Sequence, residues 1–530
     1  MHRILVTDPL SEQGLMQLTG AADVEVSQQI GATEDEIVAM IGDFDALLVR
    51  SQTKVTERIL KAGRRLRVVG RAGVGVDNID VRAATKAGVL VINAPDGNTV
   101  TTAEFTFAMI LALARHIPQA RASLLAGKWE RSTFQGFELR GKTLGVVGLG
   151  RIGAEVAKRA QVFGMQVTAY DPFLTPARAE KLGVRGASLL DTIATADIIT
   201  VHTPLTKETK HLIGDKEFAA MKPGVRILNC ARGGIIDEAA LARALDQGIV
   251  AGAAFDVFEV EPPVGNPLLG YSQVIATPHL GASTEEAQVN VAVDVADGVV
   301  RLLRGESYPH TVNLPPLPSE TRAALQPFMD LAQVLGSLAG QLLVPADVRS
   351  VKIHYEGDVT SHPVDPLTRS ALKGILSCFQ QDEVNLLSAL LIAEELGVDV
   401  IESKAPRTAG HPSSIRVTLQ GTGGEVTLLG SVTRGHGMRI EEIDGYPVDV
   451  APTAAMLVTW HRDRPGIIGR VGSVLGLAGI NIASMQVGRR EEGGQAIMLL
   501  AVDRPVAEDA VRAIRDAMDM DRVTYLELPC

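Results

Sequence analysis

The sequence predicts an α/β protein in which two doubly wound parallel-sheet domains precede two smaller α+β domains. Short apolar strands alternate with helical segments over residues 1–95 and again from residue 143, and this alternation is typical of parallel sheets with helical crossovers. The chain has 530 residues, which is more than a single hydrophobic core serves. Aromatic residues make up only 4% of it, so aliphatic side chains must supply the core, as in strands buried on both faces.

In the first unit, four apolar segments predict parallel strands. They are RILVTD near the N-terminus, DALLVR (45–50), LRVVGR (66–71) and GVLVINAP (88–95). A long helix is predicted next, over residues 101–127, because apolar residues recur there at helical spacing. A later helix, over 288–304, is predicted to return to this unit. We therefore assign residues 1–97 and 285–312 to the first domain.

The second unit begins with the strand and turn TLGVVGLG (143–150). Gly148, Gly150 and Gly153 form a GxGxxG pattern, which alone is a weak signal. Here an apolar strand precedes the glycines, a helix follows them, and Asp171 ends the next strand. That context is the fingerprint of a dinucleotide-binding Rossmann domain. An acidic residue at this place accepts hydrogen bonds from ribose hydroxyls and repels a 2′-phosphate, so it favours NAD over NADP. We assign residues 98–284 to this domain.

Three motifs that end predicted strands of the second unit carry side chains suited to hydride transfer. Arg232 lies in NCARGG, Glu261 in DVFEVEP and His279 in TPHLG. Loops at the carboxyl ends of parallel strands line the ligand crevice. A histidine can take a hydroxyl proton while hydride leaves the same carbon, a carboxylate can orient it, and an arginine can hold a substrate carboxylate. Spacing alone leaves Glu259 as an alternative to Glu261.

The C-terminal part of the chain follows a proline-rich linker, HTVNLPPLPSE (310–320). Residues 318–452 mix helical stretches with the strands VKIHYEG, SIRVTLQG and GEVTLLGSV, which predicts an α+β domain. Residues 455–530 begin with the strand AMLVTWH and continue through a glycine-rich turn, a helix, two strands and a second helix. We assign these two segments to two further domains.

Composition and charge exclude several other classes of protein. The 51 basic and 62 acidic side chains give a net charge of −11, so no general attraction to nucleic acid or to an anionic membrane is expected. The three cysteines are widely spaced, which favours neither a disulfide framework nor a zinc site, and no metal is expected. The N-terminus reads as a strand rather than as a secretory signal. A cytoplasmic location is therefore expected.

Over residues 1–310 the chain resembles the D-isomer-specific 2-hydroxyacid dehydrogenases. GLGRIG, HTPLT (202–206), NCARGGIIDE (229–238), DVFEVEP (256–262) and TPHLGAST (277–284) follow in the family order. The resemblance implies a flavodoxin-like substrate-binding first domain, with Arg232 as carboxylate binder, His279 as acid/base and Glu261, rather than Glu259, as its partner. It also implies further NAD contacts at Arg151, Ile152, Thr203, Cys230, Ala231, Arg232, Asp256, His279, Leu280, Gly281 and Ala282.

Within this family, RSQT (50–53), GRAGVGVDN (70–78), NAPDGNT (93–99) and KWER (128–131) resemble motifs of members that act on a phosphorylated acid. The resemblance implies 3-phosphoglycerate and 3-phosphohydroxypyruvate as the substrate pair, and a side reduction of 2-oxoglutarate. Arg232 can hold only the carboxylate, so further cations must hold the phosphate. Two alternatives remain, a sister enzyme that reduces glyoxylate or hydroxypyruvate and a non-catalytic NAD sensor. The residues implied for the substrate are Arg50, Arg71, Asn98 and Arg131.

Residues 455–530 resemble an ACT domain, a ferredoxin-like βαββαβ module that binds amino acids. The resemblance rests on DRPG (463–466), the helix after it and the segment INI at 480–482. It implies a regulatory L-serine site that includes His461, with Asp463 toward the ammonium and Asn481 toward the carboxylate or hydroxyl. Residues 318–452 resemble the intervening domain of long family members, and the family implies a homotetramer. The alternative for both extensions is assembly without regulation.

Overall fold

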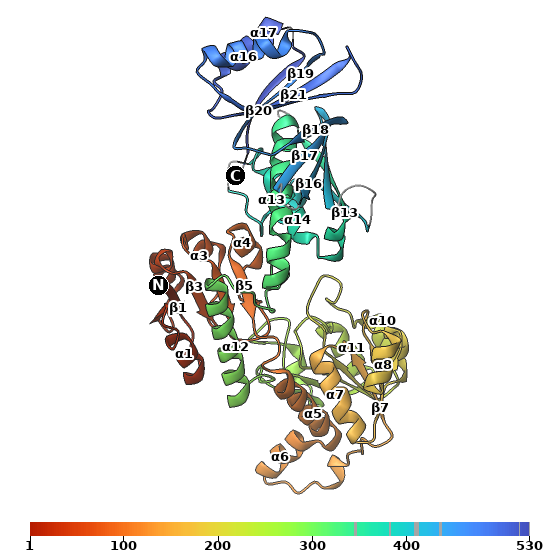
Figure 1. Ribbon diagram of the computed structural model, residues 1–530. Helices are drawn as coiled ribbons and strands as arrows, with labels where there is room; N and C mark the ends of the chain where they lie inside the picture. The colour runs from red at the N-terminus through yellow and green to blue at the C-terminus, as the bar shows by residue number, and fades with distance from the viewer. Residues whose placement is uncertain (344–346, 381–382, 407–412, 434–436, 519, 529–530) are drawn as a thin grey trace.

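Figure 1 shows the chain in a computed structural model, which describes all residues except 344–346, 381–382, 407–412, 434–436, 519 and 529–530. The two parallel sheets lie side by side at one end of the molecule (Figure 1). The long helix α13 (Ser319–Leu343) leads from them toward the two C-terminal sheets. The predicted α/β fold with two further α+β units is confirmed.

The first sheet is parallel, with the strand order β2-β1-β3-β4-β5, which is the flavodoxin-like order. Helix α12 (Glu285–Leu303) returns to it, because Val291, Val295 and Val299 pack in one core with the strands. Strand β2 was not predicted from the sequence, since it is an edge strand in which only Val24 is buried. The elements are β1 (His2–Val6), α1 (Glu12–Thr19), β2 (Val24–Gln28), α2 (Glu34–Met40), β3 (Ala46–Val49), α3 (Glu57–Ala62), β4 (Val68–Arg71), α4 (Val81–Lys86) and β5 (Leu90–Asn93).

The second sheet is also parallel, with the order β12-β11-β10-β9-β6-β7-β8. Its first six strands in chain order follow the Rossmann order, so β6 and β9 meet at the point where the connection reverses direction. Ligands bind at such a point beyond the carboxyl ends of the strands. The elements are β6 (Thr143–Val147), α7 (Arg151–Val162), β7 (Gln166–Tyr170), α8 (Pro176–Leu182), β8 (Arg185–Gly186), α9 (Leu189–Thr195), β9 (Ile198–Val201), α10 (Asp215–Ala219), β10 (Val225–Asn229), α11 (Glu238–Asp246), β11 (Val250–Phe255) and β12 (Val274–Ala276).

The helix predicted over 101–127 is wrong in its middle, because the structure has two helices, α5 (Thr99–Arg115) and α6 (Ile117–Leu125). His116 between them has a φ of 52°, in the left-handed region, and Pro118 follows in the first turn of α6. Proline has no backbone N–H to donate to a carbonyl oxygen of the preceding turn. Helix α5 therefore ends, and a new helix starts at this point. No single helix in the described chain is long and apolar enough to cross a membrane; α5 and α6 together meet that test but are bent by 61°.

The third sheet has the order β14-β13-β15-β16-β17-β18, with α13, α14 (Asp365–Leu376) and α15 (Ala389–Glu395) beside it. Glu395 at the end of α15 forms ion pairs with Arg82 (2.6 Å) and Lys86 (2.8 Å) of α4, which ties this unit to the first one. Strands β14, β17 and β18 were not predicted from the sequence. The strands are β13 (Val348–Gly357), β14 (Asp399–Ala405), β15 (Ser413–Gly421), β16 (Gly424–Thr433), β17 (Gly437–Ile443) and β18 (Tyr446–Val450).

The fourth sheet is antiparallel, with the order β20-β21-β19-β22, and the βαββαβ sequence of its elements is as predicted. Alternate residues of a strand face opposite sides of a sheet. Leu457 faces the core with α16 and α17, whereas Met456 and Val458 lie in the same core as the third sheet and α13. One face of the fourth sheet therefore belongs to the hydrophobic core of the third sheet, and the other face has a core of its own. The elements are β19 (Ala455–Arg462), α16 (Ile467–Leu477), β20 (Ile482–Arg489), β21 (Gln495–Val502), α17 (Glu508–Met518) and β22 (Arg522–Glu527).

Candidate active site

A cleft between the first two sheets contains two adjoining cavities, of about 490 and 460 Å³. Both are lined by segments that follow the carboxyl ends of strands from the two sheets, where ligands of open parallel sheets bind. The larger cavity brings together ten of the predicted cofactor residues, namely Arg151, Ile152, Thr203, Cys230, Ala231, Arg232, Asp256, His279, Gly281 and Ala282. The smaller one brings together Arg50, Arg71, Asn98, Arg232, Glu261 and His279.

The glycine-rich turn between β6 and α7 has different reasons for its three glycines. Gly148 has a φ of 94°, and a Cβ on it would lie 2.7 Å from the carbonyl oxygen of His202. A Cβ on Gly153 would lie 2.1 Å from the carbonyl oxygen of Gly148. By contrast, a Cβ on Gly150 would meet nothing within 4 Å. The turn itself therefore requires Gly148 and Gly153, while Gly150 keeps the backbone open to a ligand at the N-terminus of α7.

Asp171, at the carboxyl end of β7, holds the same turn from the side. Its carboxylate accepts hydrogen bonds from the backbone N–H groups of Leu149 (2.9 Å) and Phe173 (2.8 Å), one on each oxygen. A carboxylate has about four lone-pair positions, so Asp171 can accept further hydrogen bonds from ribose hydroxyls. Asp171 does not line either of the two cavities described above.

Several buried polar atoms in the larger cavity find no hydrogen-bond partner among the described residues. They are Oδ1 of Asn98, Oγ1 of Thr102, Nδ1 of His202 and Oγ1 of Thr203. Burial lowers the pKa of His202 to about 4, so its imidazole is neutral near pH 7. Buried polar groups in folded proteins are normally paired. These atoms are consequently suited to the hydroxyl, amide and phosphate groups of a dinucleotide.

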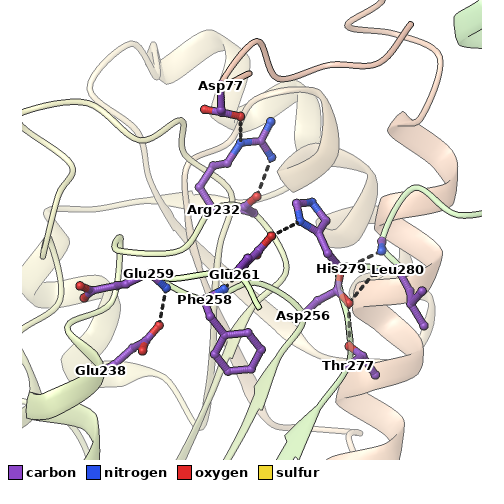
Figure 2. Close-up of polar contacts among 12 residues, drawn as sticks. Asp77, Arg232, Glu238, Asp256, Phe258, Glu259, Glu261, Thr277, His279 and Leu280 are labelled. Carbon is purple, nitrogen blue, oxygen red and sulfur yellow. Dashed lines mark hydrogen bonds and ion pairs between the residues drawn. The ribbon is translucent and has the colours of Figure 1, made fainter. Parts of the chain in front are cut away.

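The structure distinguishes the two candidate partners of His279. Nδ1 of His279 lies 2.9 Å from Oε2 of Glu261, whereas Glu259 bonds to Nε2 of His211 at 2.7 Å. Figure 2 shows Glu261 directed at the imidazole and Glu259 directed away from it, beside Glu238. The other oxygen of Glu261 accepts the backbone N–H of Phe258 at 3.1 Å. This geometry fixes Nδ1 of His279 toward Glu261 and leaves Nε2 for the cavity.

Asp256 is almost fully buried at the end of β11 and organises the loop that carries His279. Its oxygens accept hydrogen bonds from the Thr277 hydroxyl (2.6 Å) and from the N–H groups of Leu280 (2.7 Å) and Gly281 (2.7 Å). Its backbone oxygen accepts the N–H of His279, whose φ of 56° lies in the left-handed region. Three of about four lone-pair positions are thus used within the loop. One remains for the cofactor contact expected from the sequence.

Arg232 lies in a tight turn after β10. The Asn229 side chain accepts the N–H of Ala231 (3.0 Å) and donates to the carbonyl oxygen of Arg232 (2.8 Å). A Cβ on Gly233 would lie 1.8 Å from the carbonyl oxygen of Phe258, so only glycine lets the turn pack this closely. The Arg232 guanidinium reaches Asp77 across the cleft, with Nε 3.3 Å from Oδ2. The turn therefore presents the guanidinium to the cavity that also contains His279.

Arg50, Arg71 and Arg232 place three cations around the smaller cavity. Burial and the neighbouring Arg232 and Arg50 lower the pKa of Arg71 to about 10, against the opposing charges of Asp77 and Asp8, so Arg71 is still charged near pH 7. Nε of Arg71 is buried and has no hydrogen-bond partner among the described residues. Such a group costs free energy unless a ligand satisfies it. The cavity therefore has enough positive charge to hold an acid with more than one negative charge.

Two residues that support this cluster were not singled out from the sequence. Asp8, buried after β1, accepts hydrogen bonds from the backbone N–H groups of Arg50 (2.6 Å), Gln52 (3.2 Å) and Thr53 (3.2 Å). Asn78 donates to the carbonyl oxygens of Arg50 and Thr53, both at 2.7 Å. Together they fix the loop that carries Arg50. The position of Asp8 at the end of a buried strand was the available signal.

Arg131 is the exception among the predicted substrate residues, because it lines neither cavity within one chain. It is exposed and follows α6, a helix in which no residue is buried. Nearby apolar side chains are exposed as well: Leu125 by 70% and Trp129 by 79%. The break at His116 turns this segment away from the course of α5 and so separates Arg131 from the other arginines.

The three residues predicted for an L-serine site have separate partners in the fourth sheet. His461 is buried, bonds through Nδ1 to the Thr459 hydroxyl at 3.1 Å, and has a pKa lowered by burial, against the charge of nearby Asp463. Asp463 forms an ion pair with Arg489 at 2.9 Å, which lowers the pKa of Asp463. The backbone N–H of Asn481 donates to a third residue, Asp503, at 3.1 Å. An amino acid that binds through Asp463 must therefore compete with Arg489.

Family models match three segments of the chain. Residues 107–281 match the NAD-binding domain of D-isomer-specific 2-hydroxyacid dehydrogenases, residues 324–444 the D-3-phosphoglycerate dehydrogenase intervening domain, and residues 455–517 the ACT domain. D-3-phosphoglycerate dehydrogenase from Bacillus subtilis (strain 168) is 47% identical over 530 residues, covering 100% of both chains. The Methanocaldococcus jannaschii protein of the same name is 45% identical and also covers 100% of both chains.

Solved structures resemble somewhat more than half of this chain. The structure of D-lactate dehydrogenase from Aquifex aeolicus, in complex with NAD and lactic acid, superimposes with a TM-score of 0.51 at 29% identity. It covers 57% of this chain and 96% of the other. Apo D-lactate dehydrogenase from Escherichia coli gives a TM-score of 0.52 at 26% identity, covering 59% of this chain and 100% of the other. The shared part therefore corresponds in extent to the two parallel-sheet units.

Proposed function

Because the chain belongs to the D-3-phosphoglycerate dehydrogenase family and is an NAD-dependent 2-hydroxyacid dehydrogenase, we propose that it oxidises 3-phospho-D-glycerate to 3-phosphohydroxypyruvate. This would make it the first enzyme of the phosphorylated route to L-serine. The observation that carries the proposal is the cavity in which Arg50, Arg71 and Arg232 surround the His279–Glu261 pair. A substrate with a carboxylate at one end and a phosphate at the other matches this arrangement of charge.

We propose catalytic roles for His279, Glu261 and Arg232 that agree with their geometry. Arg232 holds the substrate carboxylate and polarises the C2 oxygen. His279 donates Nδ1–H to Glu261, so Nε2 carries the lone pair that accepts the C2 hydroxyl proton. The imidazole gains a positive charge in this step, and the carboxylate of Glu261 stabilises it. Bound NAD supplies the acceptor for the hydride that leaves C2.

Arg50 and Arg71 are proposed to bind the phosphate. Arg71 has a buried, unpartnered Nε and stays charged near pH 7. A second carboxylate could occupy the same place, since it carries charge and acceptor oxygens as a phosphate does. We therefore also propose that the enzyme reduces 2-oxoglutarate as a side reaction, with NADH as donor. Asn98, whose Oδ1 has no partner among the described residues, lies between the two cavities and can contact either ligand.

We propose a homo-oligomer, with a tetramer as the expected state, in which the end of α6 and the segment after it contact a second copy. An exposed apolar segment without a buried residue is typical of an interface, and Leu125 and Trp129 give this segment that character. In such an assembly Arg131 of one copy would lie against the substrate cavity of another. The cytoplasm is proposed as the location of this assembly.

We further propose that L-serine binds the ACT domain and inhibits the enzyme. The family match over 455–517 supports an amino-acid effector. Asp463 would bind the ammonium group after exchanging its contact with Arg489, and Asn481 would bind the carboxylate or hydroxyl. His461 is proposed to shape the site from its buried position.

The test is NADH oxidation with 3-phosphohydroxypyruvate, hydroxypyruvate, glyoxylate and 2-oxoglutarate in parallel, each with and without L-serine. Preference for the phosphorylated acid, with suppression by serine, is the expected result. Preference for hydroxypyruvate or glyoxylate would contradict the role of Arg50 and Arg71 and indicate a sister activity. NADH binding with negligible turnover on all four acids would indicate a sensor. Activity that serine leaves unchanged would restrict the ACT domain to assembly.

A further inference from the structure

Two ion pairs cross the cleft between the first two sheets. Asp77, in the segment after β4, reaches Arg232, with Oδ2 3.3 Å from Nε. Asp96, in the segment after β5, reaches Arg151 at the start of α7, with Oδ1 2.6 Å from Nε. In both pairs the carboxylate comes from the substrate-side sheet and the arginine from the dinucleotide-side sheet. Because the same arrangement occurs twice, we infer that the two ion pairs have the same role.

Arg232 is the residue proposed above to bind the substrate carboxylate, and Arg151 is one of the residues predicted to contact the cofactor. Arg232 lines both cavities, and Arg151 lines the larger one beside the glycine-rich turn. A carboxylate binds a guanidinium best through two parallel N–H bonds along one edge. The Nε edge of Arg232 is already occupied by Asp77, and its Nη1 donates to the carbonyl oxygen of Ala231 at 2.7 Å. A substrate carboxylate can use the Nε edge only if Asp77 leaves it.

We propose that Asp77 and Asp96 are placeholder counter-ions. Each neutralises its arginine while the cleft is empty; the substrate carboxylate displaces Asp77 from Arg232, and the cofactor pyrophosphate displaces Asp96 from Arg151. The inference rests on the proposed function for the place of each ligand. It does not depend on the phosphate of the substrate, because every 2-oxo acid of this family brings a carboxylate to Arg232.

The exposure of the carboxylates suits displacement. The side chains of Asp77 and Asp96 are 71% and 56% exposed, and exposed ion pairs are weak and are screened by salt. Asp96 also has an alternative partner on its own side of the cleft, because its Oδ2 lies 3.4 Å from Nε2 of His310. A released Asp96 therefore keeps a compensating contact.

The placeholders also have a physical reason to exist. Arg50, Arg71 and Arg232 repel one another, and this repulsion contributes to the lowered pKa of Arg71. Asp77 offsets part of this positive charge, which would otherwise attract small anions from solution more strongly. A ligand that makes only one weak contact does not displace the carboxylate from its arginine. A ligand that contacts several arginines at once binds tightly enough to displace it.

The experiment compares Asp77→Asn and Asp96→Asn in the full chain at low ionic strength. The readouts are the dissociation constant of NADH, from the change in its fluorescence, and KM and kcat with 3-phosphohydroxypyruvate. Asp77→Asn is expected to lower KM about two- to fivefold, with a smaller change in kcat and in NADH affinity. Asp96→Asn is expected to tighten NADH by a similar factor with little change in KM. Both effects should disappear at about 0.5 M salt.

A matched control removes a charge at the same rim without breaking either pair. Glu286→Gln does this, because Glu286 is exposed in the first turn of α12, next to the cavity residue Ala287. Equal tightening of both ligands in all three variants would overturn the proposal in favour of long-range electrostatics. Weaker substrate binding or a large loss of kcat in Asp77→Asn would overturn it, because Asp77 would then position Arg232. Unchanged constants would overturn it as well.

Failure of the proposed function gives a different result. If the wild-type enzyme prefers an unphosphorylated acid, the same titrations are made with hydroxypyruvate, which retains the carboxylate. NADH binding is measured without any substrate. Whichever acid is preferred, the experiment can therefore show whether Asp77→Asn affects only substrate binding and Asp96→Asn affects only NADH binding.

Discussion

The active-site cleft and the C-terminal sheet differ in whether their polar groups have hydrogen-bond or ion-pair partners within the protein. In the cleft, Nε of Arg71 and a group of other buried oxygen and nitrogen atoms have no hydrogen-bond partner among the described residues. In the C-terminal sheet, the predicted ligand residues are satisfied by protein: Asp463 by Arg489 and His461 by Thr459. An unsatisfied buried group raises the free energy of the empty protein. The cleft is therefore organised for a ligand, whereas an effector in the C-terminal sheet must replace existing contacts.

The largest expected effect tests whether the cleft is catalytic. His279→Gln removes the proton acceptor and should lower kcat by about 10²- to 10⁴-fold, the range typical of a lost general base. The dissociation constant of NADH should change far less. Steady-state kinetics and NADH fluorescence titration measure the two quantities. Turnover within a few-fold of wild type would remove His279 from the mechanism and weaken the contrast with the C-terminal sheet.

A second test uses the two glutamates that the sequence alone could not separate. Glu261→Gln should lower kcat by about ten- to a hundredfold, because the imidazolium formed during the reaction loses its stabilising charge. Glu259→Gln is the matched control, since Glu259 bonds to His211 instead. Its kcat should stay close to wild type. An equal loss in both variants would mean that overall charge in the loop, rather than the contact at 2.9 Å, supports His279.

A third test concerns the unsatisfied arginine. Arg71→Gln should raise KM for 3-phosphohydroxypyruvate about ten- to a hundredfold, as expected for one charge-assisted contact. KM for hydroxypyruvate should change much less. Arg64→Gln, at an exposed position before β4, is the control for loss of a positive charge. Equal changes for the two acids would show that Arg71 does not read the phosphate.

The smallest effect on turnover is expected in the C-terminal sheet. Asp463→Asn should abolish inhibition by L-serine and change kcat without serine by less than about twofold, since Asp463 lines neither cavity of the cleft. Inhibition curves over a range of serine concentrations measure this. Arg489→Gln separates ligand contact from ion-pair loss: it should make serine bind more tightly by freeing Asp463. Retained inhibition in Asp463→Asn would move the effector site elsewhere.

Much of the fold could be predicted from the sequence because buried parallel strands leave continuous apolar runs. Strand β2 was not predicted because it is an edge strand in which only one residue, Val24, is buried, so its sequence has no apolar run. The break at His116 was not predicted because the apolar spacing continues on both sides of it. Pro118 was a signal in the sequence that a new helix starts there. The run QAIMLLAV of β21 is buried along almost its whole length, which indicates a sheet covered on both faces. The four-domain division itself stays a prediction.

The site could be predicted to the level of residue types and loops. The Arg232, Glu261 and His279 motifs each follow a strand, so topology alone brings them to one edge of the sheet. Contacts that depend on side-chain direction could not be predicted, including the choice between Glu261 and Glu259. The position of Arg131 relative to the cleft could not be predicted from strand order, because Arg131 lines neither cavity within one chain.

The core shared by the third and fourth sheets bears on how this chain can be engineered. Met456, Val458 and Leu526 of the fourth sheet are buried against the same cluster as Leu335 of α13. A chain shortened before β19 would leave that cluster facing water, and large exposed apolar patches cause aggregation. The ACT domain therefore packs into the third sheet and is not an independently folded unit that could be exchanged alone. Grafting it onto another enzyme would require transplanting α13 and the third sheet together with it.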